Sequence, residues 1–343
     1  TPLQNNLQEL WALLNFMDPT HFASLEAFQR RFGEIQESRQ VAALHTALKP
    51  YLLRRLKSDV EQALPSRLET LVECQMAEMQ KKVYRSLFEH NFDHLQMGCK
   101  QKNFANFTNL MMELRKCCNH PYLIRGVEEA GVEARPVPLS DNKAMSDDLV
   151  KVCGKLQLLD KLLAKLHAGG HKVLIFSQMT RVLDILEDYC TGRRYMYERL
   201  DGSVSGRERQ AAIDRFTDSA SERFIFLLST KAGGVGINLV AADTCIIFDS
   251  DWNPQNDAQA LARCHRIGQT QQVHVYRLLM AKTYERRMLD TASRKLGLER
   301  AIFGGLDVSE GSEGSTGTTS AEARAEIENL LRHGAYGAFL QVP

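Results

Sequence analysis

Two arginines lie three residues apart in the stretch QNDAQALARCHRIGQ, which runs from Gln255 to Gln269. This spacing places Arg263 and Arg266 on one face at the end of a predicted helix. A guanidinium group is planar, always charged and shaped to donate to phosphate oxygens. The pair therefore suggests arginine fingers, which neutralise charge while a γ-phosphate is transferred to water. A solvated pair of surface charges is the alternative.

Polar residues and glycines follow four of the predicted buried strands. The run VLIFS ends at Ser177 and is followed by Gln178, YERL is followed by Asp201 and Gly202, FIFLLS ends at Ser229 and is followed by Thr230 and Lys231, and CIIFDS is followed by Asp251 and Trp252. Ligands of parallel sheets bind beyond the carboxyl ends of the strands. These four loops are therefore the predicted site.

The third of these loops, STKAGGVGIN, combines hydroxyl groups with glycines. Such loops leave backbone N–H groups open to an anion. The sequence contains no GxxxxGK[ST] stretch, and this loop lacks the GxGxxG spacing. We therefore predict that it touches phosphates without being the main nucleotide-binding loop.

The elements that position these loops follow from the hydrophobic pattern. Between Lys151 and Gly304, helical runs alternate with short apolar runs, which predicts a doubly wound parallel sheet with helices on both faces. Ser205 and Glu208 form a predicted capping box, and the helix GKLQLLDKLLAKLHAGG is predicted to end at its glycines. From Leu7 to Arg125 the apolar spacing is helical throughout.

Composition limits the class of protein. The chain has 343 residues, enough for two or three structural units, and a net charge of +1, so any nucleic-acid surface must be a local patch. Its eight cysteines form no CxxC pair, which is typical of reduced thiols in an intracellular protein. No apolar run approaches the roughly 20 residues that span a membrane.

Some side chains admit two interpretations. Cys117, Cys118 and His120 resemble metal ligands, but zinc sites usually take two separated pairs, so helix packing is favoured. Asp249 and Asp251 suggest acid–base chemistry, but no nucleophile is near, so we predict that they pair with arginines of the same domain.

Other surface residues also keep two roles open. His265 either contacts a nucleotide or packs its loop. Trp252 either stacks on a base or anchors its loop beside Pro254. Two further charged groups are a basic patch of Arg54, Arg55 and Lys57 and an acidic Glu128–Glu129 stretch. Each either contacts a partner of opposite charge or forms a solvated surface.

The motifs TPLQNN, VLIFSQM, LDGS, STKAGGVGINL, DWNPQND and QALARCHRIGQ occur in this order. Together they closely resemble the Swi/Snf-type ATPases of helicase superfamily two, the chromatin remodellers. The stretches LRKCCNHPYLI and HKVLIFSQMTRVLDILEDY resemble the chromodomain-helicase (CHD) branch, and CIIFDSDWNPQND and EIENLLRHGAYGA its Kismet-like members. Val235 departs conservatively from the leucine common in that family.

The resemblance implies a domain organisation. In that family two RecA-like lobes hold ATP between them, and this chain resembles the C-terminal half of the motor. The implied regions are the end of the first lobe (1–6), helical protrusions and an inter-lobe linker (7–125), an acidic flexible loop (126–150), the second, α/β RecA-like lobe (151–304), a disordered linker (305–320) and a brace-like helix (321–343).

The resemblance also implies roles for single residues. Arg263 and Arg266 would be the arginine fingers. Nucleotide contacts are implied for Gly236, Asn238, Gln259 and Gln269, and DNA contacts for Ser177, Gln178, Asp201, Gly202, Ser229, Thr230, Lys231 and Trp252. ATP with Mg²⁺ is the implied ligand, with the Mg²⁺ ligands on the first lobe and no metal site in this chain.

The implied function is that of a nuclear, DNA-dependent ATPase that translocates on DNA and repositions nucleosomes. Its implied partners are double-stranded DNA, histones and the first RecA-like lobe of the same protein, with no membrane. Because the first lobe lies outside this chain, the isolated chain is expected to be inactive. A DNA translocase of repair or transcription, and a non-catalytic DNA- or protein-binding module, remain alternatives.

Overall fold

The computed structural model describes residues 7–32, 44, 47–48, 50–51, 64–89, 104–129, 142–218, 220–233, 237–286 and 288–289. The chain divides into two compact units, 1–62 with 290–325, and 63–289 with 326–343. The predicted regions 1–6, 305–320 and 321–343 lie outside the described residues. So do Arg54, Arg55, Lys57, Val235 and Gly236.

The smaller unit contains helices α1 (Leu7–Met17) and α2 (Leu25–Phe32). Their apolar faces form a small core that includes Leu14 and Phe28. The turn between the helices is fixed by Asp18, whose carboxylate accepts from the Thr20 hydroxyl at 2.6 Å and the Tyr51 hydroxyl at 2.7 Å.

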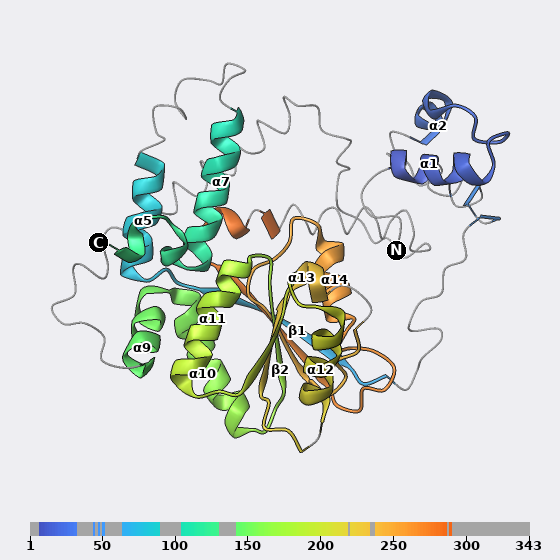
Figure 1. The fold of residues 1–343 in the computed structure, drawn as a ribbon. Coiled ribbons are helices and arrows are strands. Elements are labelled where there is room, and N and C mark those ends of the chain that lie inside the picture. Colours follow the sequence, from blue (N-terminus) through green and yellow to red (C-terminus); the bar gives the residue numbers. More distant parts are fainter. Residues whose placement is uncertain are drawn as a thin grey trace. The chain divides into compact units, whose positions relative to one another are not determined.

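The larger unit is built on one six-stranded sheet in the order β1-β6-β5-β2-β4-β3. Figure 1 shows this sheet with the helices around it. Every neighbouring pair of strands is parallel. The strands are β1 (Arg67–Cys74), β2 (Val173–Ser177), β3 (Tyr197–Leu200), β4 (Ile225–Ser229), β5 (Thr244–Ile247) and β6 (Val273–Met280). The predicted α/β, RecA-like parallel sheet is therefore confirmed.

Helices cover both faces of this sheet. In β2, Val173 and Ile175 enter one core, whereas Leu174 and Phe176 enter the other. This double burial explains why the strands are continuous apolar runs. The first core is completed by α5 (Glu78–Glu89), α7 (Phe104–Asn119), α9 (Asn142–Val152), α10 (Gly154–Ala168) and α11 (Thr180–Arg193), and the second by α12 (Gly206–Thr217) and α14 (Pro254–Leu261).

Strand β1 is a correction, because 7–125 was predicted to be entirely helical. It lies at the sheet edge and pairs with β6, from Arg67 opposite Val273 to Cys74 opposite Met280. Its first five residues are exposed, so no buried face marks them as a strand. The partner that makes this segment a strand lies about 200 residues further along, and local spacing cannot reveal it.

The predicted helix ends are confirmed. The backbone N–H of Ser205 donates to Glu208 Oε2 at 3.4 Å, within the capping box that begins α12. Helix α10 ends at Ala168 and is capped by Gly169, and Gly170 has a φ of 71°, which favours glycine.

The described part of the predicted acidic loop 126–150 is more ordered than predicted. Helix α9 occupies its second part and packs against α11 with very little space between the two backbones. A Cβ placed on Gly192 of α11 would lie 2.4 Å from the Asn142 carbonyl oxygen and 2.5 Å from the Ser146 Cβ. This close approach and the burial of Val152 order the segment in spite of its polar composition.

Gly192→Ala is expected to destabilise the larger unit by about 1–3 kcal/mol, because α9 must move away from α11. Gly206→Ala is the matched control: it lies at the first residue of α12, where a Cβ meets nothing within 4 Å. There, alanine is expected to be neutral or stabilising by up to about 1 kcal/mol. Urea unfolding measures both, and equal stability of the two variants would contradict the close packing.

Candidate functional site at the carboxyl edge of the sheet

The parallel sheet places the ends of its strands along one edge. Gln178 follows β2 and Thr230 follows β4, and these strands are neighbours with Ser177 opposite Ser229. Asp201 follows β3 at one end of the same edge. The fold therefore brings the predicted strand-end residues of separate loops to a single edge.

The arginine segment is fixed to the loop after β4. Helix α14 ends at Leu261, so Arg263 and Arg266 lie in the turns beyond it and not on a helix face as predicted. The backbone N–H of Leu239 donates to the Arg263 carbonyl at 3.0 Å. The exposed Asn238 precedes Leu239, so the predicted nucleotide residue and the arginines share one corner of the edge.

Gln269 holds this corner together. Its Nε2 donates to the carbonyls of Ala242 at 2.8 Å and Val240 at 3.1 Å, and its Oε1 accepts from the Gln271 N–H at 2.9 Å. Gln269 is only 6% exposed. Its amide therefore supports the arginine segment from within, which differs from the predicted nucleotide contact. The adjacent Gly268 has a φ of 100°, which explains the glycine in this turn.

The two arginine charges lie close to each other. Burial lowers the pKa of Arg263, and the positive charge of Arg266 lowers it further. Arg266 is exposed. Like charges held together at a part-buried position disfavour each other, and a bound anion would offset this cost. His265, between them, donates from Nε2 to the Pro65 carbonyl at 2.8 Å, which favours its loop-packing role.

Several predicted DNA contacts face inward. Ser177 is fully buried, and its hydroxyl donates to Asp249 Oδ1 at 2.6 Å. Asp201 is 8% exposed and accepts from the Ser203 N–H at 2.9 Å. Ser229 is also buried. These side chains stabilise the loops at the edge from the protein interior, because short polar side chains at strand ends form hydrogen bonds with nearby backbone groups.

Only some of the predicted DNA-binding and nucleotide-binding residues are accessible to solvent. Lys231, Gly202 and Trp252 are exposed, and Gln178 and Gln259 are partly exposed. Trp252 is 38% exposed, so part of its ring is available for a surface contact. Thr230 is 2% exposed, yet its Oγ1, like the Nε2 of Gln178, has no hydrogen-bond partner among the described residues.

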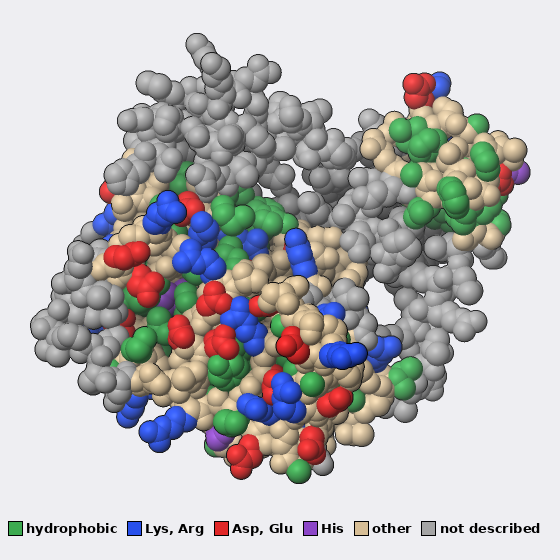
Figure 2. Space-filling model, in the orientation of Figure 1, with side chains coloured by type: hydrophobic (Ala, Val, Ile, Leu, Met, Phe, Trp, Pro, Cys, Tyr) green, Lys and Arg blue, Asp and Glu red, His purple; other side chains and the backbone are tan. Residues whose placement is uncertain are grey.

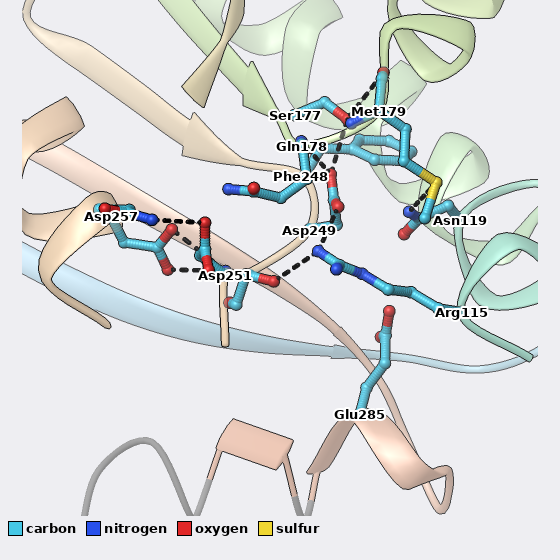
Figure 3. A network of polar contacts seen from close by, with 12 residues as sticks. Arg115, Asn119, Ser177, Gln178, Met179, Phe248, Asp249, Asp251, Asp257 and Glu285 are labelled. Carbon is cyan, nitrogen blue, oxygen red and sulfur yellow. Dashed lines mark hydrogen bonds and ion pairs between the residues drawn. The ribbon is translucent and has the colours of Figure 1, made fainter. Parts of the chain in front are cut away.

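A buried ion pair that the sequence did not reveal lies behind this edge (Figure 3). Arg115 of α7 donates from one Nη to Asp249 Oδ2 and to the Ser250 carbonyl, both at 2.9 Å. Asp249 therefore pairs with an arginine, but this arginine comes from the region 7–125 and not, as predicted, from the same domain as Asp249. Asp251 differs, since its carboxylate accepts from the Asn253 N–H at 2.8 Å and from Asn256 Nδ2 at 2.9 Å.

A second buried cation lies on α10. Lys155 is fully buried, and its ammonium donates to Glu285 Oε1 at 2.9 Å, to Asn119 Oδ1 at 3.0 Å and to the Phe248 carbonyl at 3.0 Å. Burial lowers the pKa of Lys155, but the charges of Glu285 and Asp249 and the hydrogen bond to Glu285 together outweigh it, so the pKa is raised. The lysine is therefore charged and holds the end of β5.

A third pair fixes helix α14. Arg277 of β6 donates from Nη1 to Asp257 Oδ2 at 2.5 Å and to Ser250 Oγ at 2.9 Å. Burial raises the pKa of Asp257 to about 6, although Arg277 opposes this shift. The pair anchors the start of the helix that leads to the arginine segment.

The predicted packing role of Cys117, Cys118 and His120 is confirmed. Both cysteines are fully buried in the first core. His120 Nδ1 accepts from the Tyr122 N–H at 3.2 Å, capping the short 3₁₀ helix Pro121–Leu123, and its Nε2 donates to the Leu149 carbonyl at 3.1 Å. These two bonds use both ring nitrogens of the neutral imidazole.

His120 is expected to make stability depend on pH. Burial lowers its pKa to about 4, against about 6.5 in the unfolded chain. Between these values the unfolded chain binds a proton that the folded chain does not, so stability falls as pH falls. Of a total of about 3 kcal/mol, about 2 should be lost between pH 7 and pH 5.

The control for this dependence is His120→Asn. Its side-chain oxygen still accepts from the Tyr122 N–H at the cap, but it does not titrate. Urea unfolding at the two pH values should show a smaller loss for the variant. Equal losses in the wild type and the variant would show that His120 is not the group responsible.

Two known domain families match parts of this chain. Residues 1–123 match the SNF2-related domain, and residues 154–268 match the helicase conserved C-terminal domain. A crystal structure of the C-terminal part of the Fun30 ATPase domain is 31% identical, with a TM-score of 0.56 over 67% of this chain and 90% of that chain.

Longer relatives match over almost the whole chain. It is 56% identical to chromodomain-helicase-DNA-binding protein 6 of Rattus norvegicus, 55% to protein 9 of Homo sapiens and 57% to protein 8 of Danio rerio. Each alignment covers 99% of this chain but only 12% of the first two relatives and 14% of the third. The chain thus spans about an eighth of the length of these relatives. None of the helices in the described ranges is both long and apolar enough to cross a membrane.

Proposed function

Because the chain belongs to the chromodomain-helicase branch of the SNF2-type ATPases, we propose that it is the C-terminal half of the motor of a DNA-dependent ATPase and contains the second RecA-like lobe. In the full-length protein this motor translocates on duplex DNA and repositions nucleosomes in the nucleus. DNA, histones and the first lobe of the same protein are its partners. The relatives' names, which combine helicase and DNA binding, support this proposal.

The observation that carries the proposal is the corner formed by Arg263, Arg266 and Asn238. Two guanidinium groups, close enough for one charge to lower the pKa of the other, lie on a segment hydrogen-bonded to the loop of Asn238. A triphosphate held by the first lobe offsets this repulsion when the lobes close. The arginines then stabilise the charge that develops on the transferred phosphoryl group.

ATP is the substrate, and Mg²⁺ is proposed to accompany it on the first lobe. In the part of the chain that the structure describes, no group of three or more His, Cys, Asp or Glu side chains is arranged to hold a metal ion. We propose that the contribution of this chain is electrostatic and positional. It orients Arg263 and Arg266 through Gln269 and the backbone of the 239–242 turn.

DNA is proposed to run along the same edge. Lys231, Gly202 and Trp252 are the exposed members, and they contact the sugar–phosphate backbone. Gln178 Nε2 and Thr230 Oγ1 are donors on neighbouring strand ends without a protein acceptor among the described residues. A phosphate oxygen that reaches them after a small shift of the covering atoms would remove the cost of burying them unpaired.

The proposal is tested by ATP turnover of the full-length protein without DNA, with duplex DNA and with nucleosomes, and by nucleosome sliding. Lys231→Gln combined with Trp252→Ala is expected to raise the DNA concentration needed for half-maximal stimulation. Lys165→Gln, an exposed lysine near the far end of α10, is the control. Stimulation by DNA without sliding would favour a translocase of repair or transcription, and no stimulation would favour a non-catalytic module.

A further inference from the structure

Neighbouring strands β2 and β5 part from each other at the carboxyl edge. After β2 the chain runs through α11 to β3, toward one end of the strand order. After β5 it runs through α14 to β6, toward the other end. The last backbone bond between them runs from the Phe248 N–H to the Phe176 carbonyl at 2.9 Å. Beyond it the loops diverge, as they do at the switch point of a doubly wound sheet, where ligands bind.

Beyond the last backbone hydrogen bond, a carboxylate links the ends of the two strands. Asp249 Oδ1 accepts from the Ser177 hydroxyl at 2.6 Å and from the Gln178 N–H at 3.0 Å. Asp249 belongs to the β5 end, whereas Ser177 and Gln178 belong to the β2 end. One oxygen of this side chain therefore joins the two diverging loops.

The other oxygen of Asp249 is held by Arg115, which reaches in from α7 (Figure 3). The same Nη nitrogen also donates to the Ser250 carbonyl at 2.9 Å. The arginine side chain is 8% exposed and that of Asp249 only 1%. In such a setting solvent screens the charges weakly, and with both carboxylate oxygens bonded the carboxylate cannot rotate without breaking these bonds.

We propose that Arg115 is a positioning residue, which acts through Asp249 to fix the ends of β2 and β5. It thereby connects helix α7 to the carboxyl edge of the sheet. Its significance for turnover rests on the proposed function. The β2 loop carries Gln178, and the β5 loop leads through Trp252 and α14 to the arginine segment. A shift of these loops would move the DNA-facing and ATP-facing groups together.

The alternative is that Arg115 only neutralises a buried carboxylate. Two variants of the full-length protein separate these roles. Arg115→Met removes the guanidinium and leaves Asp249 without its ion-pair partner. Arg115→Met combined with Asp249→Asn removes both charges but keeps an oxygen that accepts from Ser177 and Gln178. Leu163→Ala, fully buried in α10 away from the pair, controls for lost stability.

We expect Arg115→Met to lower the melting temperature and to reduce DNA-stimulated turnover at least tenfold. It should also accelerate hydrogen exchange of the backbone N–H of Gln178, which Asp249 binds. In the double variant the melting temperature should recover, while turnover stays low and exchange stays fast. Arg115→Lys, which keeps a donor and the charge, should restore part of the turnover. Leu163→Ala should lower only the melting temperature.

Recovery of turnover and slow exchange in the double variant would overturn the proposal, because neutralisation alone would then suffice. Unchanged turnover and exchange in Arg115→Met would overturn it as well. If the wild-type protein shows no DNA-stimulated turnover, the proposed function fails. The exchange of the Gln178 amide then still decides whether Arg115 positions the loop.

Discussion

Arg266→Ala is expected to lower ATP turnover of the full-length protein by about 10³-fold, the scale of a lost arginine finger. The side chain is exposed at the corner that holds Asn238, and the Arg266 carbonyl accepts from the Gln269 N–H at 3.0 Å. Its removal should therefore leave the fold and ATP binding to the first lobe intact. DNA-saturated turnover and the affinity for a fluorescent ATP analogue measure the two effects separately.

Arg194→Gly is the matched control for this variant. Arg194 is an exposed arginine at the end of α11, at the opposite edge of the sheet, and its φ of 58° suits glycine. Turnover should remain at the wild-type level. Near-normal turnover of Arg266→Ala would assign the two arginines a structural role, and loss of ATP affinity in place of turnover would make them ground-state ligands.

Lys155→Met is expected to destabilise the larger unit by about 3–5 kcal/mol, the cost of leaving a buried charge without its partner. The Glu285 carboxylate would lose its ammonium partner in a site that is 4% exposed. For a unit of this size the melting temperature should fall by about 6–20 °C. Urea unfolding and thermal melting measure the change.

The control combines Lys155→Met with Glu285→Gln. This pair carries no charge, and glutamine can still accept from the Met280 N–H that Glu285 binds at 2.9 Å. Replacing a buried ion pair as a whole is often close to neutral, so most of the lost stability should return. If the double variant is no more stable than Lys155→Met, the charge of Glu285 is not the source of the loss.

The surface of the larger unit shows why electrostatic sites were difficult to assign from composition. Acidic and basic side chains alternate over the visible face in Figure 2 without a single-sign field. A net charge of +1 is consistent with this mixture. The cations proposed to contact DNA and ATP, such as Lys231 and Arg266, are single positioned groups, and composition does not distinguish them from solvated neighbours.

The sequence by itself determined the five later strands, the capping box of Ser205 and the packing role of the cysteines. These features depend on apolar periodicity, capping chemistry and ligand spacing, which are properties of neighbouring residues. Sequence also identified Arg263, Arg266 and Asn238, whose roles in ATP hydrolysis stay predictions. The polar residues at the strand ends were found because parallel strands share one carboxyl edge.

Only the tertiary structure decided which of those polar residues face outward. Ser177 and Asp201 turn inward because Asp249 and Ser203 provide their partners, whereas Lys231 stays exposed. Strand β1 and the bridge from Arg115 to Asp249 join segments more than 130 residues apart. Pairing across such separations depends on which surfaces come into contact on folding. The spacing of residues along the chain does not predict these contacts.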